Sequence, residues 1–186
     1  MLESLLAKLG FLIYTIPAAI LLMYSHEFFR NFLFKNLSAI ESDQASSWID
    51  PVALAALSFF GVSYSGMCQS GRKDNFITFL ASQFFFPCFI LLIALYAYLK
   101  QPVSGSYLYS FLQSSISQAS ALFLWNFIPL PPFDASFFFW QRFYNESRLP
   151  PLTGTVKIFF LAVMTLLPAG SFWWRGSNIA ALLGLP

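Results

Sequence analysis

Residues 76–99 form a continuous apolar stretch of 24 residues that carries no charged side chain. About 20 consecutive apolar residues form a helix long enough to cross the hydrocarbon core of a bilayer. We therefore expect residues 76–99 to form a membrane-spanning helix.

Charged residues make up only 10% of the 186 residues, whereas hydrophobic residues make up 58%. A soluble globular domain carries about 25% charged residues, so this chain has too few charges to cover a surface that faces water. Much of its apolar surface, including 24 Phe side chains, must therefore face lipid or other helices. The net charge of +2 and the lack of any basic run longer than Arg72-Lys73 exclude a nucleic-acid partner.

Four further segments have the composition of membrane helices: residues 9–24, 51–67, 107–128 and 156–174. No A-x-A cleavage pattern follows the first of them, which favours a membrane helix over a cleaved signal peptide. Residues 107–128 are rich in Ser and Gln in their first half, and we expect these polar groups to face other helices or a wet cavity. Residues 1–186 are thus predicted to form a single all-α domain, a polytopic transmembrane helical bundle of about five spans.

The two cysteines, Cys68 and Cys88, lie in or beside apolar segments. Two such thiols do not make a disulfide framework. We expect both to be buried as small apolar packing residues, because free cysteine often has that role.

A first polar cluster, residues 25–30, follows the first apolar segment and contains His26, Glu27 and Arg30. Ionisable groups are costly at membrane depth, so such a cluster there is a candidate functional site. If the helix continues, His26 and Arg30 share one face and Glu27 can pair with Arg30. In the alternative interpretation, the three side chains only meet water at the membrane interface.

A second polar cluster, residues 126–134, holds three prolines within four positions and ends at Asp134. Such a run cannot continue a regular helix. Irregular backbone is tolerated at membrane depth only inside protein or beside a cavity, so this turn is a second candidate site. The alternative is an interhelical loop whose Asp134 is solvated.

Together the two clusters resemble the signature of the site-2 protease family of intramembrane zinc metalloproteases. That family carries H-E-x-x-H on one membrane helix and N-x-x-P-x-x-P-x-D-G after a later one. The first motif is matched at its start by His26 and Glu27, and the second at the family spacing by Asn126, Pro129, Pro132 and Asp134. The resemblance covers residues 9–150. It implies a site-2-protease-like core in a bacterial inner membrane, with an additional span at residues 156–174.

The resemblance implies a role for each matching residue. His26 and Asp134 would be zinc ligands, and Glu27 would be the general base that takes a proton from the zinc-bound water. Asn126 would contact the substrate or its oxyanion. The turn made by Pro129 and Pro132 would shape the place where an unwound substrate helix lies.

The chain departs from the family at the metal site. Arg30 stands where the second metal histidine would be, and His26 is the only histidine in the chain. Arginine is always protonated and has no lone pair for zinc, so we expect zinc to be absent or weakly bound. Ala135 replaces the glycine after the ligand Asp. The family stretch A-G-P-x-x-N reads Ala81-Ser82-Gln83 here, with Phe86 in place of the Asn.

Two interpretations of Arg30 follow. Its guanidinium could take the place of zinc and neutralise the carboxylates of Glu27 and Asp134, because burying an uncompensated charge is costly. It could instead extend to the membrane interface, leaving the site broken. In the first case we expect His26, Arg30, Asn126 and Asp134 to come together within the membrane, with Arg30 paired to Glu27 or Asp134.

Three functions remain open at this stage. In the first, the chain is a non-catalytic relative of the site-2 proteases that binds membrane helices or a partner. In the second, it is a working protease whose third zinc ligand is water, Glu27, Cys68 or a partner's residue. In the third, it is an unrelated transporter subunit or structural membrane protein. In every case the lipid bilayer surrounds it, and transmembrane helices of other proteins are the partners that the family resemblance implies.

Overall fold

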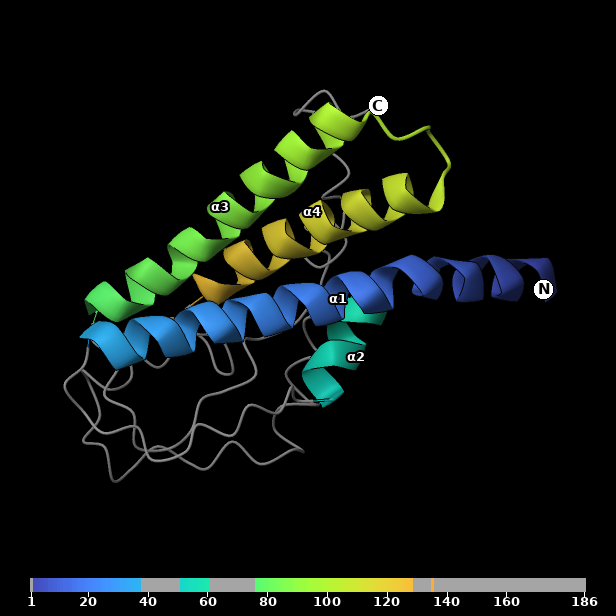
Figure 1. The fold of residues 1–186 in the computed structure, drawn as a ribbon. Coiled ribbons are helices and arrows are strands. Elements are labelled where there is room, and N and C mark those ends of the chain that lie inside the picture. Colours follow the sequence, from blue (N-terminus) through green and yellow to red (C-terminus); the bar gives the residue numbers. More distant parts are fainter. Residues whose placement is uncertain (1, 38–50, 61–75, 129–134, 136–186) are drawn as a thin grey trace.

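The computed structural model describes residues 2–37, 51–60, 76–128 and 135, and within these residues every regular element is a helix (Figure 1). The helices are α1 (Leu2–Leu37), α2 (Pro51–Phe60), α3 (Phe76–Lys100) and α4 (Tyr107–Asn126). The all-α prediction is thus confirmed for the part of the chain that the structure describes.

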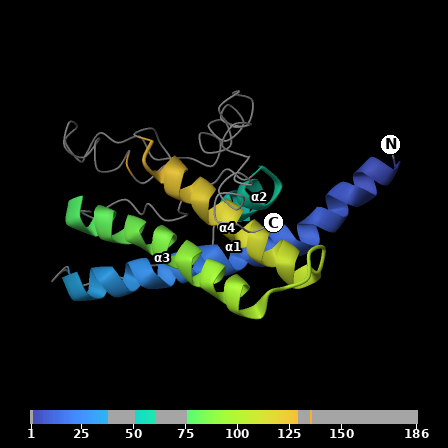
Figure 2. The ribbon, with the colours of Figure 1, turned by 90° about the horizontal axis from the view of Figure 1, so that it is seen from above.

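The three long helices α1, α3 and α4 lie side by side, and the short α2 packs on α1 (Figures 1 and 2). A short connection reverses the chain between α3 and α4, so α4 runs antiparallel to α3 and in the same direction as α1. The second half of α1, the start of α3 and the end of α4 therefore meet at one end of the bundle. The amino-terminal end of α1 extends beyond the other helices.

The helix bounds agree with the predicted spans to different degrees. The helix expected at residues 76–99 is confirmed by α3, and α4 ends two residues before the expected 128. The helix expected at residues 9–24 is longer at both ends, because α1 continues through the polar cluster to Leu37. The end of the segment 51–67 and the whole segment 156–174 lie outside the described residues.

Within the described residues, two helices are long and apolar enough to cross a membrane, over Gly10–Arg30 and Phe79–Lys100. The most apolar part of each is only 33% and 28% buried inside the chain. A core helix of a soluble protein would be mostly buried, so these two helices instead expose apolar surface. The number of spans beyond these two stays a prediction.

The outward face of α3 is apolar along its length. Its exposed large side chains include Phe84, Leu91, Leu95 and Leu99. Cys88 lies on this same face and is exposed, so the prediction that it is buried was wrong, while Cys68 lies outside the described residues. The sequence pattern of α3 is apolar on every side and did not distinguish this face from the inner one.

Three Ser and Gln side chains on the inward face of α4 are buried, but only Ser115 lies in the first half of the helix, where the prediction placed the polar groups. Ser115, Gln118 and Ser120 are all buried against the other helices. The Ser115 hydroxyl donates to the carbonyl of Phe111 at 2.9 Å, and the Ser120 hydroxyl to the carbonyl of Ile116 at 2.8 Å. These serines satisfy their hydroxyls within their own helix, which lets them lie in an otherwise apolar interior.

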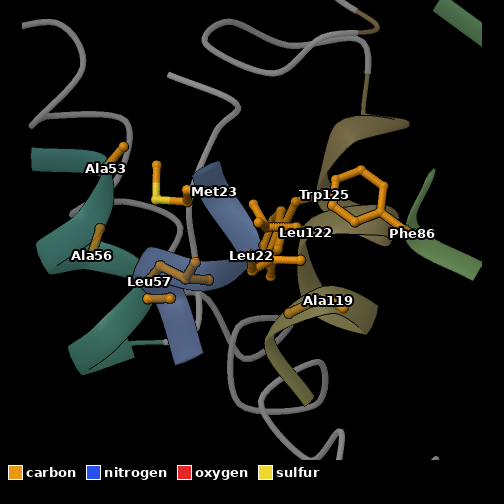
Figure 3. Close-up of a cluster of buried hydrophobic side chains, with 11 residues drawn as sticks. Leu22, Met23, Ala53, Ala56, Leu57, Phe86, Ala119, Leu122 and Trp125 are labelled. Atoms are coloured by element: carbon orange, nitrogen blue, oxygen red, sulfur yellow. The ribbon is translucent and has the colours of Figure 1, made fainter. Parts of the chain in front are cut away.

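All four helices contribute to one buried apolar cluster (Figure 3). Figure 3 shows α2 on one side of it and α3 on the other, with α1 and α4 between them. Its members include Leu22, Met23, Ala53, Ala56, Leu57, Phe86, Ala119, Leu122 and Trp125. The alanines let the helix backbones approach closely, and the larger side chains fill the space between them. A second cluster of Ile93, Ala97, Leu112 and Ile116 joins α3 to α4.

The start of α4 is fixed by its capping residue. The Ser106 side chain accepts a hydrogen bond from the backbone N–H of Tyr109 at 3.2 Å, which satisfies one of the free N–H groups at the helix start. Gly105 has φ +81°, a conformation that glycine adopts without strain. Together they turn the chain sharply enough for α4 to pack back along α3.

The central cluster gives a first prediction. Truncating Leu22, which is fully buried, should lower the free energy of unfolding by about 2–5 kcal/mol in Leu22→Ala, because a cavity replaces its side chain. Leu21 is 40% exposed on the outer face, so the matched variant Leu21→Ala should lose less than about 1 kcal/mol. Unfolding in detergent titrated with dodecyl sulfate and followed by circular dichroism measures both. Equal losses would contradict the packing described here.

Candidate functional site

The first polar cluster lies on a continuous helix and inside the bundle. His26 is 2% exposed and Arg30 is 4% exposed, and their spacing of four residues places them one above the other on one face of α1. The Nε2 atom of His26 and both carboxylate oxygens of Glu27 are also buried. An Arg30 side chain that extended to the interface would be exposed, so its burial argues against that interpretation.

His26 is held by aromatic side chains of α3. Its imidazole stacks on the ring of Phe86, with ring centroids 4.7 Å apart and an interplanar angle of 27°. The ring of Phe85 contacts the same imidazole at 5.3 Å and also contacts Phe29 at 5.6 Å. The histidine is therefore wedged between α1 and α3 with little rotational freedom.

The contact with Phe86 shows how far along the axis of α3 His26 lies. Phe86 is ten residues into α3, about 15 Å from the first residue of that helix at 1.5 Å per residue. Because α1 and α3 run in opposite directions, Arg30 lies about one turn, or roughly 5–6 Å, nearer to the start of α3 than His26 does. Both side chains are thus level with the charge-free part of α3.

Asn126, the last residue of α4, is fully buried. Neither its Oδ1 nor its Nδ2 atom has a hydrogen-bond partner among the residues that the structure describes. Leaving such a group unsatisfied costs about 1–3 kcal/mol, so a polar group outside the described residues is expected to meet this carboxamide. The helix ends here in a tighter turn, in which the N–H of Phe127 donates to the carbonyl of Leu124 at 3.2 Å.

Two contacts locate Asn126 at the same end of the bundle as His26. Its neighbour Trp125 belongs to the central cluster together with Phe86, on which His26 stacks. Its other neighbour, Phe127, contacts the ring of Phe79 in α3 at 5.8 Å, edge to face. The end of α4 is therefore packed beside the stretch of α3 that faces the first polar cluster.

The rest of the second motif is not described. Pro129, Pro132 and Asp134 lie outside the described residues, whereas Ala135 is described and buried. The approach of Asp134 to His26, and its pairing with Arg30, stay predictions. The structure does bring His26, Arg30 and Asn126 to one end of the bundle.

The residues that the structure describes do not form a zinc site. A catalytic zinc site uses three protein ligands, and within the described ranges no three His, Cys, Asp or Glu side chains are grouped to hold a metal. The chain has a single imidazole, and the position one turn after it holds a guanidinium, which offers no lone pair. Asp134 would add one carboxylate but no second imidazole.

Sequence reasoning missed one residue of this site. Phe86 was singled out only because it departs from the family asparagine, whereas the structure makes it the stacking partner of His26. Gln83 and Ser82 are buried on the same part of α3, with the Gln83 Nε2 atom 3.4 Å from the Ser82 hydroxyl. Their place, early in an otherwise apolar span, was a signal that this part of α3 faces protein.

No protein-family model, curated protein or solved structure matches this chain.

The burial of the lone histidine gives a second prediction. Modification of His26 by diethyl pyrocarbonate, followed by mass spectrometry, should be about tenfold or more slower in the folded protein than after denaturation, because the ring must first open to solvent. Phe86→Ala should raise the rate by removing the stacked ring. Phe84→Ala, on the exposed face of the same helix, is the matched control and should leave the rate unchanged. Rapid modification of the folded wild type would show that His26 is not buried.

Proposed function

We propose that this chain is a non-catalytic relative of the site-2 proteases, which binds transmembrane helices of other proteins rather than cleaving them. The observation that supports this most directly is the burial of Arg30 one turn after the buried His26. In the family the residue at that position is a metal ligand. Here it is a permanent cation that cannot bind a metal.

The charges of the cluster support the proposal. Glu27 places a carboxylate with buried oxygens three residues before Arg30 on the same helix. A buried carboxylate needs a compensating positive charge, and a guanidinium supplies that charge together with several N–H donors. We expect Arg30 to donate to Glu27 or Asp134 over about 2.7–2.9 Å, the length of charge-assisted hydrogen bonds.

A membrane environment strengthens the functional interpretation of the polar cluster at residues 25–30. The proposal includes a multi-pass arrangement of about five spans in a bacterial inner membrane. The two apolar helices and their exposed faces support a membrane environment. If α3 spans the bilayer from its first residue, His26 lies about 15 Å deep in a hydrocarbon core about 30 Å thick. Ionisable residues at that depth are rare and mark functional sites.

Helix recognition is supported by Asn126. Its carboxamide offers two N–H donors and a carbonyl acceptor, which match the carbonyl and N–H of a peptide group in an unwound helix. The amide is buried and lacks a partner within the described residues. A residue suited to contact a substrate helix is thus retained, while the ligands needed to activate water for its cleavage are not.

Metal content gives a third prediction. The wild-type protein, purified in mild detergent, should contain far less than one zinc per chain, whereas Arg30→His should bind about one. That change adds an imidazole one turn from His26 and removes a repelling charge, so that two imidazoles and Asp134 surround an open position. Plasma mass spectrometry of the dialysed proteins measures the zinc.

Two controls complete this experiment. Arg30→Gln removes the charge without adding an imidazole and should not gain zinc, and His26→Ala in the Arg30→His background should lose it. Stoichiometric zinc in the wild type, lost in His26→Ala, would overturn the non-catalytic proposal. Cleavage of a transmembrane substrate, compared with Glu27→Ala, would then identify an active protease. If Arg30→His gains no zinc, Asp134 is not close to His26 and the family relationship is wrong.

Helix binding gives a fourth prediction. Single-span peptides with a helix-breaking Asn-Gly pair at their centre should bind the protein in vesicles more tightly than the same peptides with Leu-Leu there. Asn126→Leu should weaken the binding of the Asn-Gly peptide by about three- to tenfold, the value of one or two hydrogen bonds. Energy transfer between labelled peptide and protein measures the affinity.

Ser120→Ala is the matched control, because that hydroxyl bonds only to its own helix at 2.8 Å. Its affinity should equal that of the wild type. Equal binding of both peptides by the wild-type protein would contradict helix recognition at Asn126.

A further inference from the structure

The helix α1 contains a proline at position 17, in the middle of its apolar part. Proline has no backbone N–H, so the carbonyl of Ile13, four residues earlier, loses the donor that a regular helix would provide. An unsatisfied carbonyl is costly in an apolar environment where water is scarce. This turn of α1 therefore requires a donor from elsewhere.

The donor comes from the start of α4. The hydroxyl of Tyr107 lies 3.4 Å from the carbonyl oxygen of Ile13 and donates to it, a long hydrogen bond at the exposed edge of the contact between α1 and α4. Its ring contacts the ring of Tyr14 at 5.3 Å and stacks on that of Phe111 at 6.3 Å, with an interplanar angle of 10°. These ring contacts hold the phenol in the position from which it reaches α1.

A second α4 side chain donates to the same turn. The Nε2 atom of Gln118 lies 3.0 Å from the carbonyl oxygen of Thr15, and both residues are buried. The hydroxyl of Thr15 is turned toward its own helix, where it donates to the carbonyl of Phe11 at 3.3 Å. Two carbonyls just before Pro17 thus accept hydrogen bonds from one neighbouring helix.

Several of the apolar contacts between the same helices are made by small and aliphatic side chains. Ala19 and Leu22 of α1 pack with Ala119 and Leu122 of α4 in the central cluster, and small and aliphatic side chains like these recur at each turn. A slip by one turn, about 5.4 Å, would exchange one such contact for another. Buried polar contacts are the known means of fixing a single register between helices.

We propose that Tyr107 and Gln118 form a polar clamp on the proline turn of α1, which fixes the height of α1 against α4. The clamp thereby sets the His26–Arg30 face of α1 beside the buried carboxamide of Asn126. This inference depends on the contacts around Pro17 and does not require the proposed function. It assigns Tyr107 and Gln118 as positioning residues.

The height of the helices is measured by disulfide formation between introduced cysteines, in a background with Cys68→Ser and Cys88→Ser. Ala19 of α1 and Leu122 of α4 both lie in the central cluster, where the two helices pack against each other. Ala19→Cys with Leu122→Cys is therefore the level pair, and Met23→Cys with Leu122→Cys reports a slip of one turn. Copper-phenanthroline oxidation in vesicles gives the ratio of displaced to level crosslinking.

Tyr107→Phe and Gln118→Leu each remove one donor with little change of shape. Each should raise the displaced-to-level ratio about threefold, the average effect of a hydrogen bond between membrane helices. Tyr109→Phe, on the same helix, is the matched control and should leave the ratio unchanged. If the two variants lower the unfolding midpoint but not the ratio, the contacts only add stability and the clamp is refuted.

The proline supplies a second test that does not depend on either variant being stable. Pro17→Ala returns the N–H that the carbonyl of Ile13 lacks, so Tyr107→Phe should have no effect on the ratio in that background. The double-mutant cycle should show coupling of about the size of the Tyr107→Phe effect. Additive effects of Pro17→Ala and Tyr107→Phe would show that the Tyr107 hydroxyl does not serve the proline turn.

Discussion

Hydrogen bonds between inward-facing polar groups organise this bundle, because its outward faces are apolar and offer polar groups no partner. Along α4 the serines bond back to their own helix, as Ser115 does at 2.9 Å, whereas Gln118 reaches the backbone of α1. The apolar clusters then fill the space between helices whose relative positions are already restricted. A water-soluble domain usually places polar side chains outside and apolar ones inside, and this bundle reverses that distribution. The reversal follows from a composition with only 10% charged residues.

The same principle explains the chemistry of the candidate site. His26, Glu27 and Arg30 occupy consecutive turns of one helix, and the bundle buries them against Phe86 and its neighbours. A metal ion would normally supply the positive charge that acidic groups at such a place require. The guanidinium of an arginine can supply this positive charge as part of the chain itself. It does not provide the open metal coordination position on which hydrolysis depends. Under the proposed function, the charges of the site would be balanced without the hydrolytic reaction, and Asn126 would supply the carboxamide that meets a peptide group.

Prediction from sequence was accurate for helix length, which the absence of charged residues determined. It failed for contacts that depend on how the helices pack. The length of α3 followed from a stretch without charges. The continuation of α1 past Tyr24 was left open, because residues 25–30 interrupt the apolar pattern while the backbone stays helical. Phe86 could not be identified as the partner of His26, since 24 Phe side chains offer many equivalent candidates. The link from Tyr107 to Ile13 spans 94 residues, and no local pattern encodes a contact at that separation.

The buried arginine also bears on how the protein is made. A protein whose interior charge is balanced by a metal must acquire that ion during or after synthesis, so its folding is linked to the supply of free metal. Arg30 enters the bundle as part of α1 and is charged at every physiological pH. Under the proposed function, the interior charge would therefore be balanced as soon as α1 is in place, and assembly of the bundle would not depend on the supply of zinc.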